Sequence, residues 1–433
     1  MREMRDSGIE WIGSIPNEWK IKRIKELFYE VNERSEKNDD YQLLSVSENY
    51  GVAPKAEKVD EGDFLTHADS LEGYKICKPD DIVMNIMLAW KRALGVSRYE
   101  GIISPAYCIY RKRTNEIDTG YYHYLYRTDL YAGLFKQYST GIIDSRLRLY
   151  PNKFLSLKCQ MPELKEQKRM VEYLDSKCAQ IDSIIAKQGQ IIEKLKEYKL
   201  SVITEAVTKG LNPDAEMKDS GIKWIKKIPS SWTVTSLSNG ISLVQTGPFG
   251  SQLHSEDYIE NGDLYLINPA NIVNGQIVPD CNVSISLEKA YELKQHILEV
   301  GDIVFGRRGE MGRCACVEDD GNRYFCGTGC IKLKCNERLD AHFLTLYLQT
   351  SYIRQYLELN SVGTTMANLN SSIISKIPIV YPIIEEQKEI AKYISEKCEQ
   401  IDKKIYLQET MIRKEMQYKQ SIIYEVITGK REV

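Results

Sequence analysis

Two stretches of the 433-residue chain carry side chains whose types and spacing suggest catalysis. Residues 325–329, FCGTG, imitate the glycine-rich loop with which methyltransferases bind S-adenosylmethionine, but no Asn-Pro-Pro-Tyr or Asp-Pro-Pro-Tyr motif accompanies them, and 268–271 reads NPAN. Asp280, Glu292 and Lys294 form a loose version of a nuclease site, in which carboxylates hold magnesium. Walker, GxSxG and HExxH motifs are absent as well. We therefore expect no catalytic residues, and the chain is predicted not to be an enzyme.

Cysteine is the other residue type whose clustering suggests a metal. Five of the 11 cysteines fall in one stretch, and four thiolates would suffice to hold a structural zinc ion. The stretch lacks a CxxC pair, however, and the odd total is typical of reduced thiols in a cytoplasm. We therefore expect small core residues and no metal, and the five histidines stand singly. The clustered cysteines are Cys314, Cys316, Cys326, Cys330 and Cys335.

Loops rich in basic and polar residues occur in both halves of the chain. Arg, Lys, Asn and Gln can hydrogen-bond to base edges in the major groove of DNA, whereas Lys, Arg, Ser and backbone amides bind phosphates. Solvation explains any one of these side chains equally well, but three matched loops in each half favour a DNA-contacting surface. The first half offers Lys91, Arg92, Ser139, Thr140, Arg146 and Arg148. The second half offers Thr246, Ser251, Gln252, Arg307, Arg308, Arg313, Thr364, Thr365, Asn368 and Asn370.

Charge is unevenly distributed along the chain. The net charge of −3 argues against a wholly basic surface that coats nucleic acid. Residues 85–158, however, hold twelve Lys and Arg against five Asp and Glu, whereas residues 30–81 hold six against fourteen. Solvated loops would explain this distribution, and so would a localised groove that binds anions. No apolar run approaches the ~18 residues of a membrane span, and we expect a cytoplasmic chain.

Almost the whole chain is a tandem duplication. Residues 4–19, MRDSGIEWIGSIPNEW, return at 217–232 as MKDSGIKWIKKIPSSW. PELKEQKRMVEYLDSKCAQID, from Pro162, likewise returns as PIIEEQKEIAKYISEKCEQID from Pro382. The inserts between these frames differ in sequence, which suits a protein that binds two different targets. We expect the paired frame tryptophans to be buried against the helices that follow the inserts: Trp11, Trp19, Trp224 and Trp232.

The segments 162–208 and 382–428 predict two long helices. Their apolar residues recur at alternating steps of three and four, the seam of a coiled coil, so we expect the helices to pair. The two-fold symmetry of a duplicated chain favours antiparallel pairing, although two separate amphipathic helices would show the same pattern. The inserts predict mixed, mostly β structure, with one helix each at 121–137 and 341–358. Strands are predicted at 41–46, 81–86, 106–111, 264–267, 302–305 and 331–334.

Together these elements predict an α+β fold with two pseudo-symmetric globular domains, separated by two long helices that form an antiparallel coiled coil. The expected boundaries are a first globular domain at 1–161, a central helical spacer at 162–210, a second globular domain at 211–381 and a C-terminal helical spacer at 382–433.

Four motifs, in order along the chain, resemble the specificity subunits of type I restriction-modification systems. They are the frame at 4–19, TGPFGSQLHSEDY at 246–258, GDIVFGRRGEMGRCACV at 301–317, and the PxxEEQKEIAKYI segment at 382–394. The resemblance covers essentially the whole chain. It implies two target-recognition domains that each read one half of a bipartite double-stranded DNA site. It also implies helical regions that dock two modification (methyltransferase) subunits, restriction (endonuclease and translocase) subunits that join them, and no cofactor.

Two other functions remain open from the residues alone. A stand-alone nuclease or methyltransferase would be active as the purified chain with magnesium or S-adenosylmethionine. A coiled-coil scaffold without a role on DNA would show no salt-dependent DNA association even with its partners present. The sequence does not specify the two half-sites, the spacer, or which side chains read bases.

Overall fold

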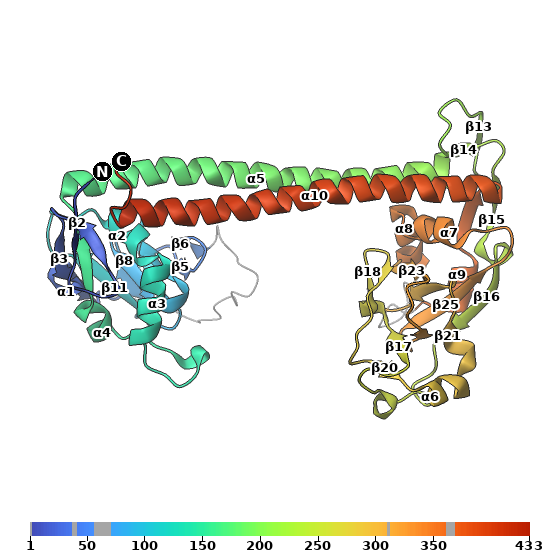
Figure 1. Ribbon diagram of the computed structural model, residues 1–433, viewed down its shortest axis with the longest axis horizontal. Helices are drawn as coiled ribbons and strands as arrows, with labels where there is room; N and C mark the ends of the chain where they lie inside the picture. Colours follow the sequence, from blue (N-terminus) through green and yellow to red (C-terminus); the bar gives the residue numbers. More distant parts are fainter. Residues whose placement is uncertain (1, 37–40, 56–70, 310–311, 361–368) are drawn as a thin grey trace. The chain divides into compact units, whose positions relative to one another are not determined.

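The computed structural model describes residues 2–36, 41–55, 71–309, 312–360 and 369–433, which divide into two compact units. Unit 1 comprises Met1–Gln188 and Thr410–Val433, and unit 2 comprises Gly189–Glu409. The two long helices, α5 (Leu164–Lys209) and α10 (Ile384–Ile427), each contribute a segment to both units (Figure 1). The chain therefore mixes helix and sheet, as predicted, and both long helices are present.

Each unit contains a four-stranded antiparallel sheet with the same strand order. In unit 1 the order is β4 (Phe28–Val31), β11 (Tyr107–Lys112), β8 (Ile82–Asn85) and β9 (Leu94–Val96). In unit 2 it is β16 (Ile241–Thr246), β25 (Cys330–Cys335), β22 (Ile303–Gly306) and β23 (Cys314–Cys316). The dissimilar inserts therefore share this sheet, and a loop leads from the same inner strand to the same edge strand in both units.

The remaining elements of unit 1 surround its sheet. Four strand pairs are formed by β1 (Met4–Asp6) with β2 (Ser14–Pro16), β3 (Lys20–Arg23) with β12 (Lys158–Met161), β5 (Leu44–Ser47) with β6 (Gly51–Pro54), and β7 (Lys75–Cys77) with β10 (Gly101–Ile103). Its short helices are α1 (Ile24–Leu27), α2 (Thr119–Tyr126), α3 (Asp129–Tyr138) and α4 (Pro151–Ser156), with 3-10 turns η2 (Ala89–Lys91) and η3 (Asp144–Arg146).

Unit 2 carries a second sheet beside the shared one. That sheet consists of β20 (Ser284–Ile285), β17 (Leu264–Ile267), β24 (Tyr324–Cys326) and β21 (Ile297–Leu298). Three strand pairs are formed by β13 (Met217–Asp219) with β14 (Lys227–Pro229), β15 (Thr233–Ser236) with β26 (Pro378–Tyr381), and β18 (Ile272–Val273) with β19 (Gln276–Ile277). The helices are α6 (Leu287–Glu292), α7 (Ala341–Leu348), α8 (Ser351–Asn360) and α9 (Ser371–Ser375), with 3-10 turns η4 (Leu237–Asn239), η5 (Ser255–Asp257), η6 (Pro269–Asn271) and η7 (Lys294–His296).

The strand predictions are confirmed, whereas the prediction of one helix in each insert is wrong. Strands β5, β8, β11, β17, β22 and β25 occupy or overlap the six predicted segments. Each predicted helix is instead a pair, α2 with α3 and α7 with α8, because a threonine at the break bonds to the backbone. The Thr128 hydroxyl donates to Leu125 O and accepts from Tyr131 N, which caps α3, and the Thr350 hydroxyl donates to Tyr347 O.

The repeated frames attach each unit's sheet domain to a long helix through the same contacts. Trp19 and Trp232 are each 1% exposed. The Trp19 indole nitrogen donates to Glu166 on α5 at 3.0 Å, and the Trp232 indole nitrogen donates to Glu386 on α10 at 3.1 Å. Burial of these two tryptophans therefore agrees with the prediction, and each indole N–H has the partner that a buried donor requires. Trp11 and Trp224 are only half-buried, and their rings contact Tyr131 of α3 and Tyr356 of α8.

A buried glutamine beside each of these glutamates repeats the same attachment. The Gln167 amide donates to Pro162 O and accepts from Asp118 N, and the Gln387 amide donates to Pro382 O and accepts from Asp340 N. Both side chains are fully buried. The Glu-Gln pair of each frame thus ties the start of a long helix to the residue that caps α2 or α7.

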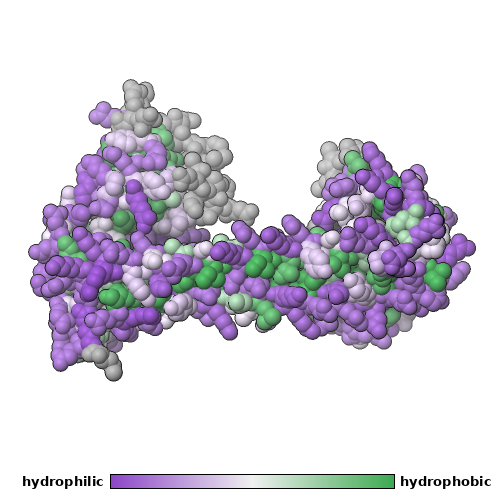
Figure 2. All heavy atoms as spheres, turned by 90° about the horizontal axis from the view of Figure 1, so that it is seen from above, coloured by the Kyte–Doolittle hydropathy of each residue, from purple (hydrophilic) through white to green (hydrophobic). Residues whose placement is uncertain are grey.

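The two long helices contact each other within each unit. In unit 1, Lys419 of α10 forms an ion pair with Asp182 of α5 at 2.7 Å. In unit 2, Lys199 of α5 forms one with Asp402 of α10, also at 2.7 Å. Apolar side chains also lie exposed on the long helices, as Figure 2 shows. Within the described residues, no helix is both long enough and apolar enough to cross a bilayer.

Candidate nucleic-acid interface

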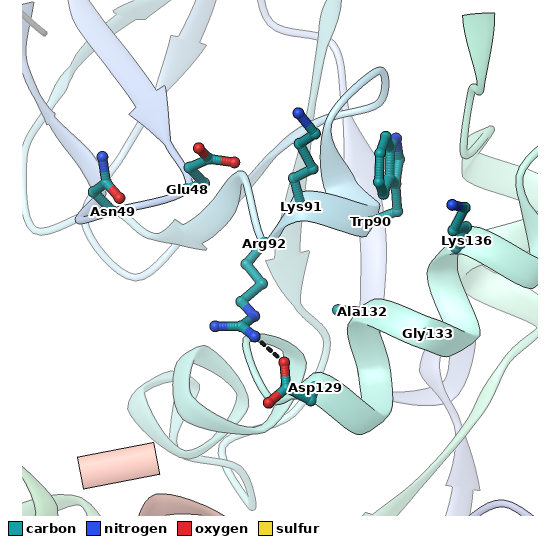
Figure 3. A pocket seen from close by; sticks show the side chains of 9 residues that line it. All are labelled: Glu48, Asn49, Trp90, Lys91, Arg92, Asp129, Ala132, Gly133 and Lys136. Carbon is teal, nitrogen blue, oxygen red and sulfur yellow. Dashed lines mark hydrogen bonds and ion pairs between the residues drawn. The ribbon is translucent and has the colours of Figure 1, made fainter. Parts of the chain in front are cut away.

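In unit 1, the loop between β8 and β9 presents Lys91 and Arg92 from a tight turn. The 3-10 turn η2 ends at Arg92, whose φ of 68° is left-handed, and Ala93 N then donates to Leu88 O at 3.1 Å. A positive φ is uncommon for a residue other than glycine and here reverses the chain between the two strands. The turn brings the Arg92 guanidinium to the Asp129 carboxylate at the start of α3, where the two form an ion pair (Figure 3).

A pocket of about 440 Å³ opens between this loop and α3. The Trp90 ring forms one wall, and Lys91 Nζ and Lys136 Nζ lie 5.3 Å and 4.8 Å from its centroid. Both ammonium groups lie over the ring as cation–π contacts, so a base that stacks on Trp90 takes the place of one of them, while phosphates attract the cations. The lining residues are Glu48, Asn49, Trp90, Lys91, Arg92, Asp129, Ala132, Gly133 and Lys136 (Figure 3).

Arg127 holds two loops of this pocket together. Its guanidinium donates to the carbonyl oxygens of Arg92 and Leu94 at 2.8 Å, which belong to the β8–β9 loop and β9. It also donates to the carbonyl oxygens of Glu48 at 2.8 Å and Asn49 at 3.2 Å, in the β5–β6 turn. Burial first, and then nearby Arg92, lower the pKa of Arg127 to about 10, which still leaves it charged at neutral pH. Arg127 therefore holds the pocket loops in position without lining the pocket itself.

His123 lies one helical turn before Arg127 and makes unit 1 sensitive to acid. Its Nδ1 accepts a hydrogen bond from Val96 N at 3.2 Å, which requires that nitrogen to be unprotonated. Burial first, and then Arg127 and Arg98, lower the pKa of His123 from 6.5 to about 3. The unfolded chain therefore binds a proton that the folded chain excludes, and the stability from neutral His123 is present above pH 6.5 and lost as the pH falls towards 3.

We accordingly expect the free energy of opening unit 1 to fall between pH 6.5 and 5, by at most about 1.4 kcal/mol per pH unit. Hydrogen exchange of the β8 and β9 amides, measured on the full chain, reports this change. His123→Gln keeps a hydrogen-bond acceptor but cannot titrate, so the variant should show a flatter dependence over the same window. An equal slope in the two proteins would assign the acid sensitivity to other groups.

The segment after α3 places its predicted contact residues unequally. The Ser139 hydroxyl donates to Phe135 O at 2.7 Å and so closes α3, while Thr140 and Arg148 exchange backbone hydrogen bonds at 2.9 and 3.0 Å. Arg146 lies exposed on the 3-10 turn η3 between them, and Ile142 at the tip is fully exposed. Arg146 and Thr140 are thus the exposed members of the four predicted residues, whereas Ser139 has a structural role.

In unit 2, the loop between β22 and β23 corresponds to the Lys91–Arg92 loop and carries Arg307, Arg308 and Arg313. Gly306 N donates to Arg313 O at 2.8 Å, which closes the loop across the strand pair. Arg307 N donates to Gly329 O, and Arg313 Nη1 approaches Pro269 O at 3.4 Å. Burial first, and then Arg308, lower the pKa of Arg307. The loop is therefore anchored by its backbone and concentrates positive charge at the end of the sheet.

The other predicted residues of unit 2 lie in two segments. Thr246 ends β16, and Gln252 sits in the following turn with Ser251, where its Oε1 accepts from Phe249 N at 3.1 Å. The turn starts at Gly247, where an added Cβ would lie 1.9 Å from Gly327 O, so only glycine fits. Asn370 caps α9, its side chain accepting from Ile373 N at 2.9 Å. Thr364, Thr365 and Asn368 lie outside the described residues.

Tertiary contacts add residues that the sequence analysis did not single out. Trp90 directly precedes the predicted Lys91, so its position beside a basic pair was a usable signal. Lys136 and Arg127 had none, because they join the β8–β9 loop only when α2 and α3 pack on it. The structure thus gathers Lys91 and Arg92 with new neighbours, while the segment containing Ser139, Thr140, Arg146 and Arg148 does not line the pocket.

Comparison with known proteins gives one consistent result. Residues 242–412 match the family model described as the type I restriction modification DNA specificity domain. The type I restriction enzyme EcoBI specificity subunit of Escherichia coli is 28% identical to this chain, over 54% of it and 50% of the relative. The EcoDI specificity subunit of Escherichia coli is 21% identical over 89% of this chain and 82% of the relative.

Solved structures share the fold over nearly the full length. A chain from work on complex assembly and conformational transition of the type I R-M system superposes with a TM-score of 0.74 at 15% identity, covering 96% of this chain and 99% of that one. The HsdS subunit from Thermoanaerobacter tengcongensis gives 0.55 at 15% identity, covering 96% and 98%. The matched domain and the relatives thus show that this chain is similar to the specificity subunits of type I restriction-modification systems, and the solved structures show a shared fold.

Proposed function

We propose that the chain is the non-catalytic DNA sequence-specificity subunit of a type I restriction-modification complex. Residues 1–161 and 211–381 act as target-recognition domains, and each reads one half of a bipartite site. The observation that carries this proposal is the loop that joins an inner strand of the shared sheet to its edge strand, β8 to β9 in unit 1 and β22 to β23 in unit 2. It bears Lys91 and Arg92 in unit 1 and three arginines in unit 2, on two scaffolds with the same strand order. One scaffold with two different basic loops suits the reading of two different sequences.

The loop residues divide into two kinds of contact. Arg92, Arg146, Arg308 and Arg313 have the forked donors that read guanine in the major groove, while Lys91 and Lys136 are point charges suited to phosphate. The proposed surface is completed by Thr140, Arg148, Thr246, Ser251, Gln252, Arg307 and Asn370, together with Thr364, Thr365 and Asn368, which lie outside the described residues. Ser139 contributes through the shape of its loop, since its hydroxyl is engaged by Phe135.

The long helices serve as a spacer and as the docking surface for two modification subunits. An antiparallel coiled coil is supported by the ion pairs within each unit, because Asp182 partners Lys419 while the later Lys199 partners the earlier Asp402. Exposed apolar side chains on the same helices offer contact area to modification subunits. Restriction subunits join through that assembly, which acts on DNA in the cytoplasm, and this chain contributes recognition rather than catalysis.

The test is to map methylated bases in a host that expresses this chain with its modification subunit. We expect one bipartite motif whose two halves are separated by an unspecified spacer. Exchanging residues 20–161 for the same segment of a relative should change one half of the motif and leave the other intact. If the active modification subunit is present and no motif depends on this chain, the scaffold function gains support. Activity of the purified chain alone, with magnesium or S-adenosylmethionine, would indicate an enzyme.

Trp90→Ala should weaken binding of the assembled complex to its site. Stacking of a base on an aromatic ring contributes about 1–3 kcal/mol, so we expect Kd to rise by about 5- to 150-fold. Trp90→Phe keeps an aromatic face and should recover most of the affinity, which fluorescence anisotropy at fixed salt would measure. Lys136→Gln should instead lower the slope of log Kd against log salt by about one, the change expected when one phosphate contact is lost. Unchanged affinity in Trp90→Ala would remove the pocket from the interface.

A further inference from the structure

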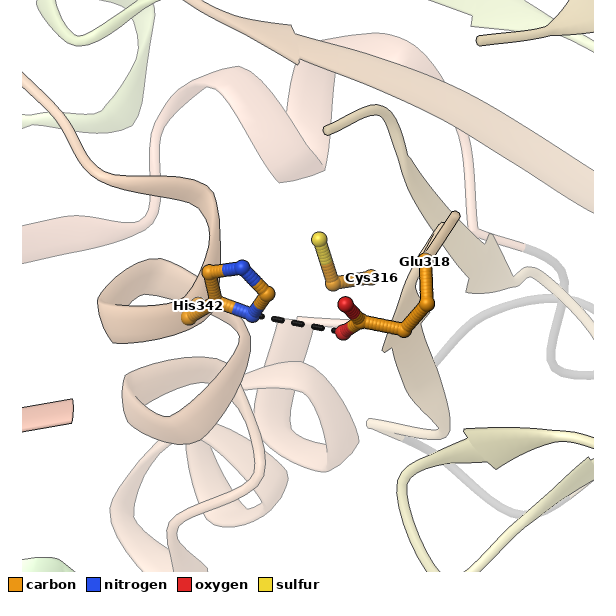
Figure 4. A group of neighbouring side chains, drawn as sticks. All are labelled: Cys316, Glu318 and His342. Atoms are coloured by element: carbon orange, nitrogen blue, oxygen red, sulfur yellow. Dashed lines mark ion pairs between the residues drawn. The ribbon is translucent and has the colours of Figure 1, made fainter. Parts of the chain in front are cut away.

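Three side chains of unit 2 with metal-binding chemistry meet where β23 ends. Cys316 is the last residue of β23, Glu318 follows two residues later, and His342 is the second residue of α7. One ligand atom from each lies within 4.8 Å of the other two, and His342 Nδ1 stands 3.3 Å from Glu318 Oε1 (Figure 4). Within the part of the chain that the structure describes, this is the group of three or more His, Cys, Asp or Glu with such spacing.

The donor set is the one that zinc prefers. Zinc binds Cys sulfur, His nitrogen and carboxylate oxygen at about 2.0–2.3 Å in a tetrahedron, which puts neighbouring donors roughly 3.3–3.8 Å apart. The widest separation, at most 4.8 Å, therefore has to shorten by about 1 Å, which the side chains of His342 and Glu318 permit because they are 53% and 63% exposed. Cys316, 7% exposed and fixed in the strand, supplies the rigid ligand.

The surroundings leave the Cys316 sulfur available to a cation. Its thiol lies 3.8 Å from Val317 O, at best a weak hydrogen bond. A divalent cation that binds the sulfur would displace the thiol proton to solvent. The resulting thiolate, together with the carboxylate, would neutralise the two positive charges of the metal.

We propose that Cys316, Glu318 and His342 form a binding site for a zinc-class divalent cation that fastens the end of β23 to the first turn of α7. The exposed side of the cluster leaves the fourth position to water. The site's expected role is structural, because α7 packs on β23 and a metal at their junction would hold the two together. This inference is independent of DNA recognition and can succeed or fail separately from it.

Unit 1 supplies a built-in comparison. Val96 pairs with Ile82 at the position where Cys316 pairs with Ile303, and the second residue of α2 is Gly120 where α7 has His342. The ligands are therefore specific to unit 2 and are not part of the duplicated frame. Of the other four clustered cysteines, Cys314, Cys326 and Cys330 are buried core residues and Cys335 is half-buried; burial is the first cause of the raised thiol pKa of each.

The test is a cobalt titration of the purified full chain after treatment with a chelator. We expect one cobalt ion per chain with a thiolate-to-cobalt charge-transfer band, which zinc then displaces. Cys316→Ser should abolish the band. His342→Ala and Glu318→Gln alter exposed side chains that the fold tolerates, and each should weaken binding by at least about tenfold. Cys281→Ser removes an exposed cysteine of the same unit and should leave the band unchanged.

A second readout keeps the proposal testable if Cys316→Ser folds poorly. Zinc should slow hydrogen exchange in the first turn of α7 in the wild-type chain, and His342→Ala should remove that protection. Either of two results would overturn the site: a cobalt complex without a thiolate band, or a band lost in Cys281→Ser and kept in Cys316→Ser. The site would also be overturned if hydrogen exchange in α7 of the wild-type chain did not change when zinc is added.

Discussion

Replacing Arg127 with methionine is expected to relax or abolish recognition of the half-site assigned to unit 1 while recognition of the other half-site persists. The guanidinium does not line the pocket, but it donates to five carbonyl oxygens in and beside the two pocket loops at 2.8–3.4 Å. Hydrogen bonds to a charged group contribute about 1.5–3 kcal/mol each, so without them the loops should separate and rehydrate. On the proposed function, we expect the assembled complex to bind its site at least about tenfold more weakly.

The expected signature is specific to a positioning residue. Methylome mapping should show relaxed or lost specificity in one half of the motif, with assembly of the modification subunits unchanged. Arg113→Met is the matched control, because Arg113 also donates to two backbone carbonyls of unit 1, those of Lys25 and Phe28, at a different loop. The control should lower stability without changing the motif. If the DNA motif is intact in Arg127→Met, the hydrogen bonds of Arg127 to the pocket loops are not needed for recognition.

Asp302→Asn is expected to destabilise unit 2 by about 3–5 kcal/mol, because it leaves a buried charge without its partner. Lys332 and Asp302 are 7% and 1% exposed and form an ion pair at 2.8 Å. Lys332 Nζ also donates to Ile297 O at 2.6 Å, and Asp302 Oδ2 accepts from Glu299 N at 2.7 Å. The pair joins β22 to β25, the two inner strands of the shared sheet. Hydrogen exchange of their amides in the full chain would report the loss.

The duplicated chain provides the control for this prediction. Asp81 directly precedes β8 as Asp302 directly precedes β22, and Ile-Val follows in both cases. Asp81 accepts two hydrogen bonds from Arg111 at 2.8 Å. Arg111 is 22% exposed and also pairs with Glu33, so Asp81→Asn should cost about 1–2 kcal/mol. Combining Asp302→Asn with Lys332→Met removes both charges and should recover most of the loss. If Asp302→Asn and Asp81→Asn destabilise the protein equally, burial of the cation does not decide how much stability is lost.

Much of the architecture could be predicted because the chain repeats its own frame. The positions of α5 and α10 follow from heptad spacing, and the Trp19 and Trp232 contacts follow from matched frames that had to serve the same purpose twice. The six strands were predictable because they are rich in Val, Ile, Leu and Tyr and lie between turn residues. The helix pairs α2–α3 and α7–α8 were not, because Thr128 and Thr350 break each helix through local hydrogen bonds that a pattern of apolar spacing does not reveal.

Only part of the candidate interface could be predicted from the sequence. Lys91 and Arg92 were predicted because basic loop residues bind anions wherever the loop lies. Their setting depends on contacts distant in sequence: Lys136 at the Trp90 ring, Arg127 behind two loops and Asp129 as the partner of Arg92. The same holds for the Cys316 cluster, whose histidine lies on a different element from its cysteine. From the sequence we expected the clustered cysteines to be small core residues without a metal, whereas the fold places Cys316 beside a histidine and a carboxylate.

The sequence by itself determined the duplication, the two long helices, the mixed α and β content and the resemblance to specificity subunits. These depend on local periodicity and on motifs that recur along the chain. Only the tertiary structure decided that both inserts contain the same four-stranded order, which residues share a pocket, and which carboxylates are buried with their cations. Such features depend on side chains far apart in sequence that meet only when the strands pair and the helices pack. The free energy of each contact follows from that burial and not from the residue's neighbours in the chain.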